Sequence, residues 1–367
     1  MEPFAERSGF SRNTVAFSYF VIYNVLVKEL SQSEINMKEV LILANEIMVS
    51  VICNAYNHER YIRDALDGFL MQKTNFAFEV LIHDDASTDK TADIIREYEA
   101  KYPDIIKPIY QTENQYSKDP SIVISLQYSR VRGKYISLCE GDDYWTDPLK
   151  LQKQVDAMEN HPEIDICAHG AYQVDAETKM ITRLIRPAKK RTIFSVRKVI
   201  IGGGAFVATN SLLYRSELVK NLPAFVRYFG FDYAWQIHGT LRSGMLYLPD
   251  IMSSYRYLSA NSWTSSMCNN HEKIRKHYKV ISIMLSLLDA ETNYCYTKTI
   301  HKKIVLDYVG VHRDCGTLSE LLKPNYHEFF QCIPIITKIE IYIRLFLPWL
   351  VEPARKLYGR ILKLREK

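Results

Sequence analysis

The sequence predicts an α/β fold in which a mostly parallel sheet is flanked by helices and followed by a helical C-terminal region. Two observations lead to this prediction. Short apolar runs suited to buried strands alternate, from Met48 to Gly170, with segments whose apolar residues recur at helical spacing. Beyond residue 270 the helical spacing continues without strand-like runs. Strand and helix in alternation are typical of a doubly wound sheet, in which helices connect parallel strands.

Each predicted strand is a short apolar run, and each predicted helix between them has one apolar face. The predicted strands are 48–53, 78–83, 105–110, 134–139, 164–170 and 245–258. The predicted helices are 60–72, a turn and helix within 84–103, 147–162 and 231–244. The third helix is expected to begin with Asp147 as N-cap and Pro148 at the first helical position.

Composition and charge restrict the class of protein. The chain has 367 residues and an ordinary globular composition, enough for about two domains. Its net charge of +5 is too mild to indicate nucleic acid. The seven cysteines are scattered and form no CxxC pair, which predicts reduced, buried thiols in a cytoplasmic protein. No signal peptide is evident, and the apolar run 14–27 is shorter than a membrane span.

Polar and acidic residues follow three of the predicted strands. Asn54 to Asn57 follow the first strand, Asp84 and Asp85 the second, and residues 140–143 (EGDD) the fourth. Ligands of open parallel sheets bind at the carboxyl ends of the strands, so these residues predict one shared site. Taken singly, the aspartates could cap the next helix and Asn57 could shape a turn.

The EGDD stretch indicates a cation. Asp142 and Asp143 are adjacent, and like charges so close raise each other's pKa unless something offsets them. Mg²⁺ or Mn²⁺ prefers oxygen ligands and commonly takes one or two carboxylates together with substrate phosphates. The sequence therefore predicts a metal–diphosphate site, with a solvated acidic loop as the alternative.

Several separated motifs resemble the inverting family 2 glycosyltransferases, which have the GT-A fold. The motifs occur in that family's order between Val49 and Trp263, and EGDDYWTDPLKLQKQ is similar to bacterial members that build capsule, exopolysaccharide or lipopolysaccharide chains. The resemblance implies an N-terminal extension at 1–47, a catalytic domain at 48–265 and a helical C-terminal region at 266–367 with a basic amphipathic tail.

The resemblance also implies roles for the strand-end residues. Asn54, Tyr56 and Asp85 would hold the nucleotide base and ribose, and Asp84 would steady the same turn. Asp143 would be the likelier direct ligand of Mg²⁺ or Mn²⁺. The remaining implied site residues are Asp142 for ribose or metal, and Glu140, Tyr255, Arg256 and Trp263 around the donor or acceptor.

The implied reaction is a single displacement. Asp232 matches the family's catalytic base and would take the proton of the acceptor hydroxyl as it attacks the anomeric carbon of a nucleotide-diphosphate sugar. The acceptor would be a glycan or a lipid-linked sugar in surface polysaccharide synthesis, and no nucleic acid is expected. The alternatives are a non-catalytic sugar-nucleotide-binding protein or a nucleotidyltransferase, although the latter would need a basic, glycine-rich phosphate loop after the first strand.

The sequence departs from the family pattern at several places. His83 stands where the family usually has an aliphatic residue or glycine, and Phe231 where it often has glycine or an acid. Residues 114–118 (NQYSK) lack a common glycine, and YRYLSANSW lacks a histidine that many relatives carry just after Tyr-Arg. These departures leave the donor-side contacts open. A packed histidine at position 83 is favoured over one that tunes nucleotide choice.

The end of the chain combines apolar, aromatic and basic residues. From Lys338 onward there are eight basic residues and three acidic ones, an excess equal to the net charge of the whole chain. This composition fits an interfacial helix on an anionic membrane, with peripheral contact at the inner face of the plasma membrane. It fits equally a helix packed on the catalytic domain.

Overall fold

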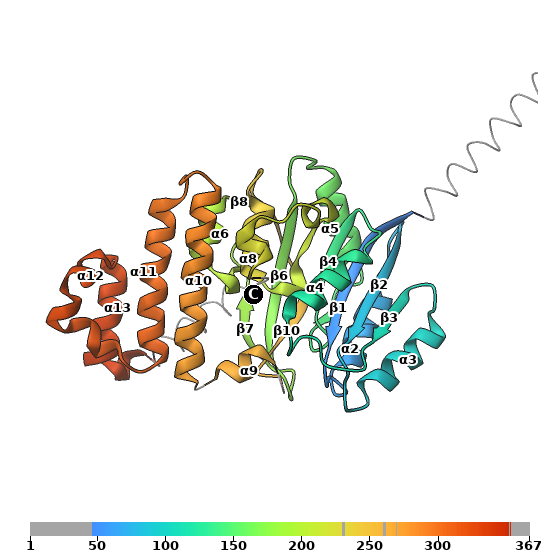
Figure 1. Cartoon of the computed structure of the whole chain (residues 1–367), viewed down its shortest axis with the longest axis horizontal. Helices are drawn as coiled ribbons and strands as arrows, with labels where there is room; N and C mark the ends of the chain where they lie inside the picture. The colour runs from blue at the N-terminus through green and yellow to red at the C-terminus, as the bar shows by residue number, and fades with distance from the viewer. Residues whose placement is uncertain (1–45, 230–231, 260–261, 269, 352, 354–367) are drawn as a thin grey trace, which may run out of the picture.

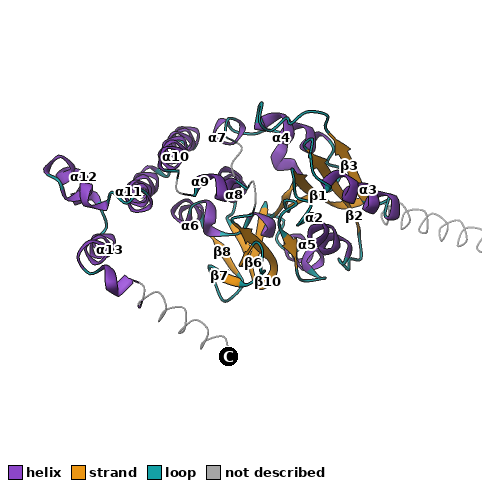
Figure 2. Cartoon of the chain, turned by 90° about the horizontal axis from the view of Figure 1, so that it is seen from below, coloured by secondary structure: helices purple, strands orange, loops and turns teal. Residues whose placement is uncertain are grey.

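The computed structural model describes residues 46–229, 232–259, 262–268, 270–351 and 353. Most of the predicted extension at 1–47 and most of the basic tail therefore lie outside the described residues, as does Phe231. The described chain forms one large sheet with helices on both faces, and its C-terminal helices extend away from the sheet at one end (Figures 1 and 2).

The sheet has ten strands in the order β3-β2-β1-β4-β9-β6-β10-β5, with β7 paired to β6 and β8 to β10. The strands are β1 (Ile47–Ala55), β2 (Ala77–Asp84), β3 (Ile106–Tyr110), β4 (Tyr135–Leu138), β5 (Tyr144–Trp145), β6 (Ile166–Asp175), β7 (Ile181–Ile185), β8 (Thr192–Phe194), β9 (Leu213–Arg215) and β10 (Met245–Tyr257). Strands β1 to β4 are parallel to one another, as predicted. Beyond them the sheet is mixed, because β9 pairs antiparallel with both β4 and β6 while β6 and β10 are parallel.

All six predicted strands are present, as β1, β2, β3, β4, β6 and β10. The helices are α2 (Ile62–Leu70), α3 (Thr91–Lys101), α4 (Pro120–Ser129), α5 (Lys150–Glu159), α6 (Val196–Gly202), α7 (Ala224–Arg227), α8 (Asp232–Thr240), α9 (Trp263–Met267), α10 (His271–Glu291), α11 (Thr297–Asp314), α12 (His327–Cys332) and α13 (Ile335–Phe346). The predicted start of α5 at Pro148 is wrong, since the helix begins at Lys150. The Asp147 carboxylate instead accepts a hydrogen bond from the Leu149 N–H at 2.8 Å, just before the helix.

Two apolar cores hold the two faces of the sheet. On one face, α2 and α5 pack on β1, β2 and β4, and the rings of Phe69 and Trp145 meet edge to face with centroids 4.8 Å apart. On the other face, α6, α8 and α10 pack on β4, β6 and β10, where Tyr214 and Trp235 stack at 5.4 Å. Strand β1 is buried on both faces, which is why its sequence is a continuous apolar run.

The seven cysteines are free, as predicted, but only four are buried. The buried four are Cys53, Cys139, Cys167 and Cys315, and the exposed three are Cys268, Cys295 and Cys332. The prediction of burial is wrong for the exposed three because they lie at or next to helix ends on the surface and not in strands.

Candidate active site

The parallel pairing of β1 with β2 and β4 brings three strand ends together. At the end of β1, the Asn54 N–H donates to Glu140 Oε2 at 3.2 Å, and its side-chain amide donates to Glu140 Oε1 at 3.4 Å. The Gly141 N–H in turn donates to the Asn54 carbonyl at 2.9 Å. Glu140 therefore links the acidic turn after β4 to the end of β1.

Helix α4, which the sequence pattern did not reveal, supports this junction. Gln127 is buried, and its side-chain amide donates to the Leu81 carbonyl at 3.0 Å and to Asn54 Oδ1 at 3.2 Å. One side chain thus ties β2 to the end of β1. No motif marks Gln127, so only knowledge of the helix could have singled it out.

The two aspartates at the end of β2 have different surroundings. The Asp85 carboxylate accepts the backbone N–H groups of Gln115 at 2.7 Å and Tyr116 at 3.0 Å, so the loop that lacks the family's glycine closes over it. Asp84 is buried, one of its oxygens has no partner among the described residues, and burial raises its pKa. His83 beside them is fully buried, which lowers its pKa and agrees with a packed histidine.

The acidic turn holds two adjacent aspartates in contrasting environments. Asp143 is buried, and its carboxylate accepts the Arg256 N–H at 2.8 Å and the Asn210 amide at 3.1 Å. Asp142 is only half-buried, and its carboxylate accepts the Ser259 hydroxyl. Asp142 is therefore the more open of the two carboxylates, while Asp143 joins the turn to β10.

Burial and mutual repulsion raise the pKa values of these acids. Burial, with the charges of Asp232 and Asp142, raises the pKa of Glu140 to about 8 against hydrogen bonds from Asn54 that lower it. Burial and the Asp142 charge also raise the pKa of Asp143 well above its usual value. A group of carboxylates that repel one another in this way favours the binding of a cation.

Asp232 faces the same space from the other half of the sheet. It is the first residue of α8, its carboxylate accepts the Thr209 hydroxyl, and it is exposed to solvent. Desolvation of its carboxylate raises its pKa against the Thr209 hydrogen bond, which lowers it. The charge of Asp232 is among the causes that raise the pKa of Glu140 and Tyr116. The sequence-predicted base thus lies opposite the acidic turn, although almost a hundred residues separate them.

Three residues named by the resemblance, Tyr255 and Arg256 of β10 and Trp263 of α9, lie in different surroundings. Arg256 is buried, bonds Asp64 on α2 and the Asp142 carbonyl, and lies 4.5 Å from the Tyr144 ring centroid. Its guanidinium supports the turn and does not face open solvent. Tyr255 is partly buried, and burial together with Asp143, Asp142 and Asp232 raises its pKa. Trp263 begins α9, and the position of its side chain lies outside the description.

Tyr56, by contrast, is open to solvent at the end of β1, with 37% of its surface exposed. The resemblance gives Tyr56 a part in holding the nucleotide base and ribose. Hydrogen bonds and electrostatic interactions thus connect six of the predicted residues, Asn54, Glu140, Asp142, Asp143, Asp232 and Tyr255. Tyr56, Asp84 and Asp85 lie at the adjacent ends of β1 and β2.

The described residues include no group of three or more His, Cys, Asp or Glu placed to hold a metal ion alone. The donor set nevertheless fits a cation that shares its ligands with a substrate, because Mg²⁺ and Mn²⁺ often take only one or two carboxylates and complete their shell with phosphates. Asp142 is open enough to supply such a carboxylate.

The fold has solved counterparts. The structure of Staphylococcus aureus TarS residues 1–349 in complex with UDP-GlcNAc matches with a TM-score of 0.57 and 18% identity, covering 78% of this chain and 82% of that one. A mannosyltransferase of Pyrobaculum calidifontis in complex with GDP-Man and Mn²⁺ matches with a TM-score of 0.52 and 14% identity, covering 84% of each chain. The fold is therefore GT-A, as the sequence motifs predicted.

The sequence shows a similarity to one family. Residues 50–221, slightly less than half of the chain, match the family described as Glycosyl transferase family 2. An uncharacterized protein of Mycobacterium tuberculosis is 38% identical over 59% of this chain and 61% of its own length. The putative teichuronic acid biosynthesis glycosyltransferase TuaG of Bacillus subtilis is 35% identical over 30% of this chain and 42% of its own length. The chain thus spans less than two thirds of these relatives.

Proposed function

We propose that this protein is an inverting glycosyltransferase that moves a sugar from a nucleotide-diphosphate sugar to a hydroxyl group of an acceptor. The observation that supports the proposal most directly is the placement of Asp232 opposite the strand-end residues Asn54, Glu140 and Asp142. One space is thus lined by a candidate base on one side and by a candidate nucleotide and metal site on the other. The family of the domain and the UDP-GlcNAc and GDP-Man bound to its structural counterparts support the same conclusion.

Asp232 acts as the general base in this proposal. The Thr209 hydroxyl donates to one oxygen of the carboxylate and fixes its orientation, which leaves the other oxygen to accept the acceptor's proton. The raised pKa of Asp232 strengthens it as a base. The acceptor oxygen forms its bond to the anomeric carbon as the bond to the diphosphate breaks, so the configuration inverts and no covalent nucleophile is required.

The nucleotide binds at the ends of β1 and β2. Tyr56 offers an exposed ring for stacking, and Asn54 is held in place by Glu140 and Gln127. Asp85 keeps the loop at Gln115 in place through backbone hydrogen bonds, and its carboxylate retains lone pairs that can accept from the base.

The turn of Asp142 and Asp143 would hold a Mg²⁺ or Mn²⁺ ion together with the donor diphosphate. Asp142 would supply the open carboxylate, and Asp143 would support it by fixing the turn through Arg256 and Asn210. Such a cation, when bound, offsets the negative charge that develops on the leaving diphosphate.

The acceptor belongs to a surface polysaccharide, as a glycan or a lipid-linked sugar. TuaG and the putative glycosyltransferase EpsE of Bacillus subtilis, which is 35% identical over 35% of this chain, support this class of product. We place the enzyme in the cytoplasm, where free cysteines such as these seven stay reduced, and in peripheral contact with the plasma membrane.

The test is a transfer assay with UDP-, GDP- and dTDP-sugars, with and without Mn²⁺. We expect one donor to release its nucleoside diphosphate and NMR to show a product of inverted anomeric configuration. Asp232→Asn should lower kcat by about 10²–10⁴-fold while calorimetry shows unchanged nucleotide binding. The matched control is Asp104→Asn, at an exposed residue in the turn between α3 and β3, and it should keep full activity. Transfer that survives Asp232→Asn would disprove the assignment of the base, and binding of none of the donors would disprove the proposed function.

A further inference from the structure

Helix α13 presents its apolar side chains to the outside. It lies at the end of the molecule farthest from β1–β3, beyond α11 (Figures 1 and 2). Its exposed apolar residues and those just after it are Ile335 (79% exposed), Ile336 (76%), Ile339 (52%), Tyr342 (47%), Phe346 (65%), Leu347 (40%) and Trp349 (67%). Positions 335, 339, 342 and 346 follow the helical repeat, so they form one continuous stripe, which we call the outer face of α13.

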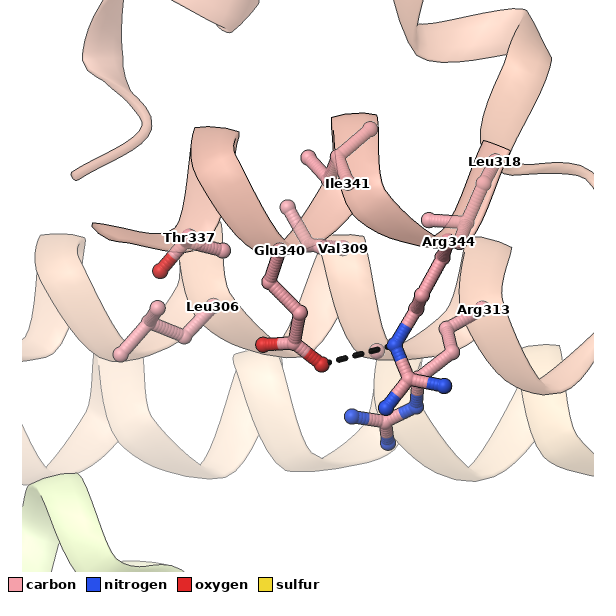
Figure 3. Close-up of a pocket in the computed structure, with 9 residues that line it drawn as sticks. Leu306, Val309, Arg313, Leu318, Thr337, Glu340, Ile341 and Arg344 are labelled. Atoms are coloured by element: carbon pink, nitrogen blue, oxygen red, sulfur yellow. Dashed lines mark hydrogen bonds and ion pairs between the residues drawn. The ribbon is translucent and has the colours of Figure 1, made fainter. Parts of the chain in front are cut away.

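The opposite side of α13, which faces the protein, is mixed, because Ile341 and Leu345 pack in an apolar cluster with Val305 and Val309 of α11 beside polar residues. Thr337, Glu340 and Arg344 line a cavity of about 180 Å³ against α11, opposite Arg313 (Figure 3). Glu340 Oε1 and Arg344 Nε form an ion pair at 2.8 Å there, and Ile341 is the one buried residue of the helix. The helix thus packs only a small part of its apolar surface inward and leaves most of its large apolar side chains on the outside.

A continuous exposed apolar face of this kind usually marks a surface that binds a protein or a membrane. The charge of the neighbouring sequence distinguishes between these two partners. The sequence from Lys338 to Lys367 carries eight basic and three acidic residues, the whole net charge of the chain. A second copy placed against the outer face would bring two such basic segments together, and they would repel. An anionic bilayer offers apolar acyl chains for the outer face and negative headgroups for the lysines and arginines.

We propose that the outer face of α13 docks this protein on an anionic lipid bilayer. The helix has 12 residues and would be about 18 Å long, too short to span a membrane. Among the described residues no helix is long and apolar enough to cross one. The helix therefore lies in the plane of the interface, with Tyr342, Phe346 and Trp349 at the depth that aromatic rings favour. The proposal does not depend on the identity of the donor or of the catalytic base.

The experiment is flotation of the full-length protein with vesicles of phosphatidylcholine alone and with vesicles of phosphatidylcholine mixed with the anionic lipid phosphatidylglycerol. We expect the wild type to float with the anionic vesicles. It should be released as the salt concentration rises above about 0.1 M, where the Debye length falls below about 10 Å. Ile339→Glu and Phe346→Glu should each lower the partition coefficient by about tenfold or more, since each removes a buried apolar side chain from the interface. Ile283→Glu, on the half-exposed face of α10, is the matched control and should bind as the wild type does.

The following outcomes would overturn the proposal. If the wild type fails to float with either vesicle, or if the control variant loses as much binding as the α13 variants, the outer face is not a membrane surface. If the wild type sediments as a dimer that Phe346→Glu dissociates, the partner of the face is a second copy of the chain. Circular dichroism of the variants verifies folding. Transfer to an acceptor in solution should be unchanged in Phe346→Glu, so loss of docking and failure of the proposed function give different results.

Discussion

Replacing Glu140 with glutamine tests the electrostatics of the acidic turn without removing its shape. Glutamine retains an oxygen that can accept from the Asn54 N–H, but it carries no charge toward Asp232 and Asp142. The pKa of Glu140 is about 8 in the folded protein, against 4.5 for an ordinary glutamate. The folded state therefore binds this proton more tightly than the unfolded state does.

The sign and size of the effect follow from this difference. The stability that the protonated Glu140 contributes is fully present below pH 4.5 and is lost as the pH rises through about 8. Because one pKa unit corresponds to about 1.4 kcal/mol, the loss has an upper bound of about 5 kcal/mol. Glu140 is partly exposed and water screens its charge, so we expect a measured loss of about 2 kcal/mol.

The assay is urea unfolding, followed by tryptophan fluorescence at pH 4, 7 and 9. Between pH 4 and 9, the free energy of unfolding of the wild type should fall by about 2 kcal/mol more than that of Glu140→Gln. Glu163→Gln, at an exposed glutamate away from the turn, should follow the wild type. Parallel pH profiles for the wild type and Glu140→Gln would refute the reasoning, because they would show that Glu140 titrates alike in the folded and unfolded states.

Three further predictions concern the same turn. Asp142→Asn should weaken Mn²⁺-dependent nucleotide binding, measured by calorimetry, and change the free energy of unfolding by less than about 0.5 kcal/mol. Asp143→Asn should instead lower the free energy of unfolding by about 1–3 kcal/mol, because the NH₂ group of the new amide would face a buried donor. A loss of binding without a loss of stability in Asp143→Asn would contradict this division. Asn210→Ala should cost a similar 1–3 kcal/mol in urea unfolding, since it leaves Asp143 with an unpaired oxygen, and an unchanged midpoint would speak against that role. Gly141→Ala should reduce nucleotide affinity and the free energy of unfolding, because the added Cβ would lie 2.8 Å from His58 Nδ1. A variant with unchanged stability and binding would show that the residues around His58 can move to accept the methyl group.

The core of the fold was predictable because the buried strands are short apolar runs followed by polar turns. Strands β1, β2 and β4 are buried on both faces, so their sequences stand out against the polar turns that follow. Since these strands are parallel, the turns lie at one edge of the sheet, and the convergence of Asn54 with Glu140 follows from topology alone.

Helix α4 could not be predicted in this way. It begins after Asp119, which accepts the Ser121 N–H at 2.9 Å, but its apolar residues are partly β-branched and lack a clear helical period. Only Val123 and Gln127 of this helix are buried, so burial leaves little trace in the sequence. Gln127 was missed for the same reason, because its importance comes from tertiary contacts with the ends of β1 and β2.

Which of two adjacent aspartates meets a ligand is a question of backbone direction. The pair Asp142–Asp143 lies in the turn between β4 and β5, where one side chain is buried and the other stays half-exposed. In the structure Asp143 turns inward, where it accepts the Arg256 N–H of β10, and Asp142 remains half-exposed. The identity of the inward residue depends on β10, which follows more than a hundred residues later in the chain. The acidic pair could therefore be recognised from its sequence, whereas the division of labour within the pair required the fold.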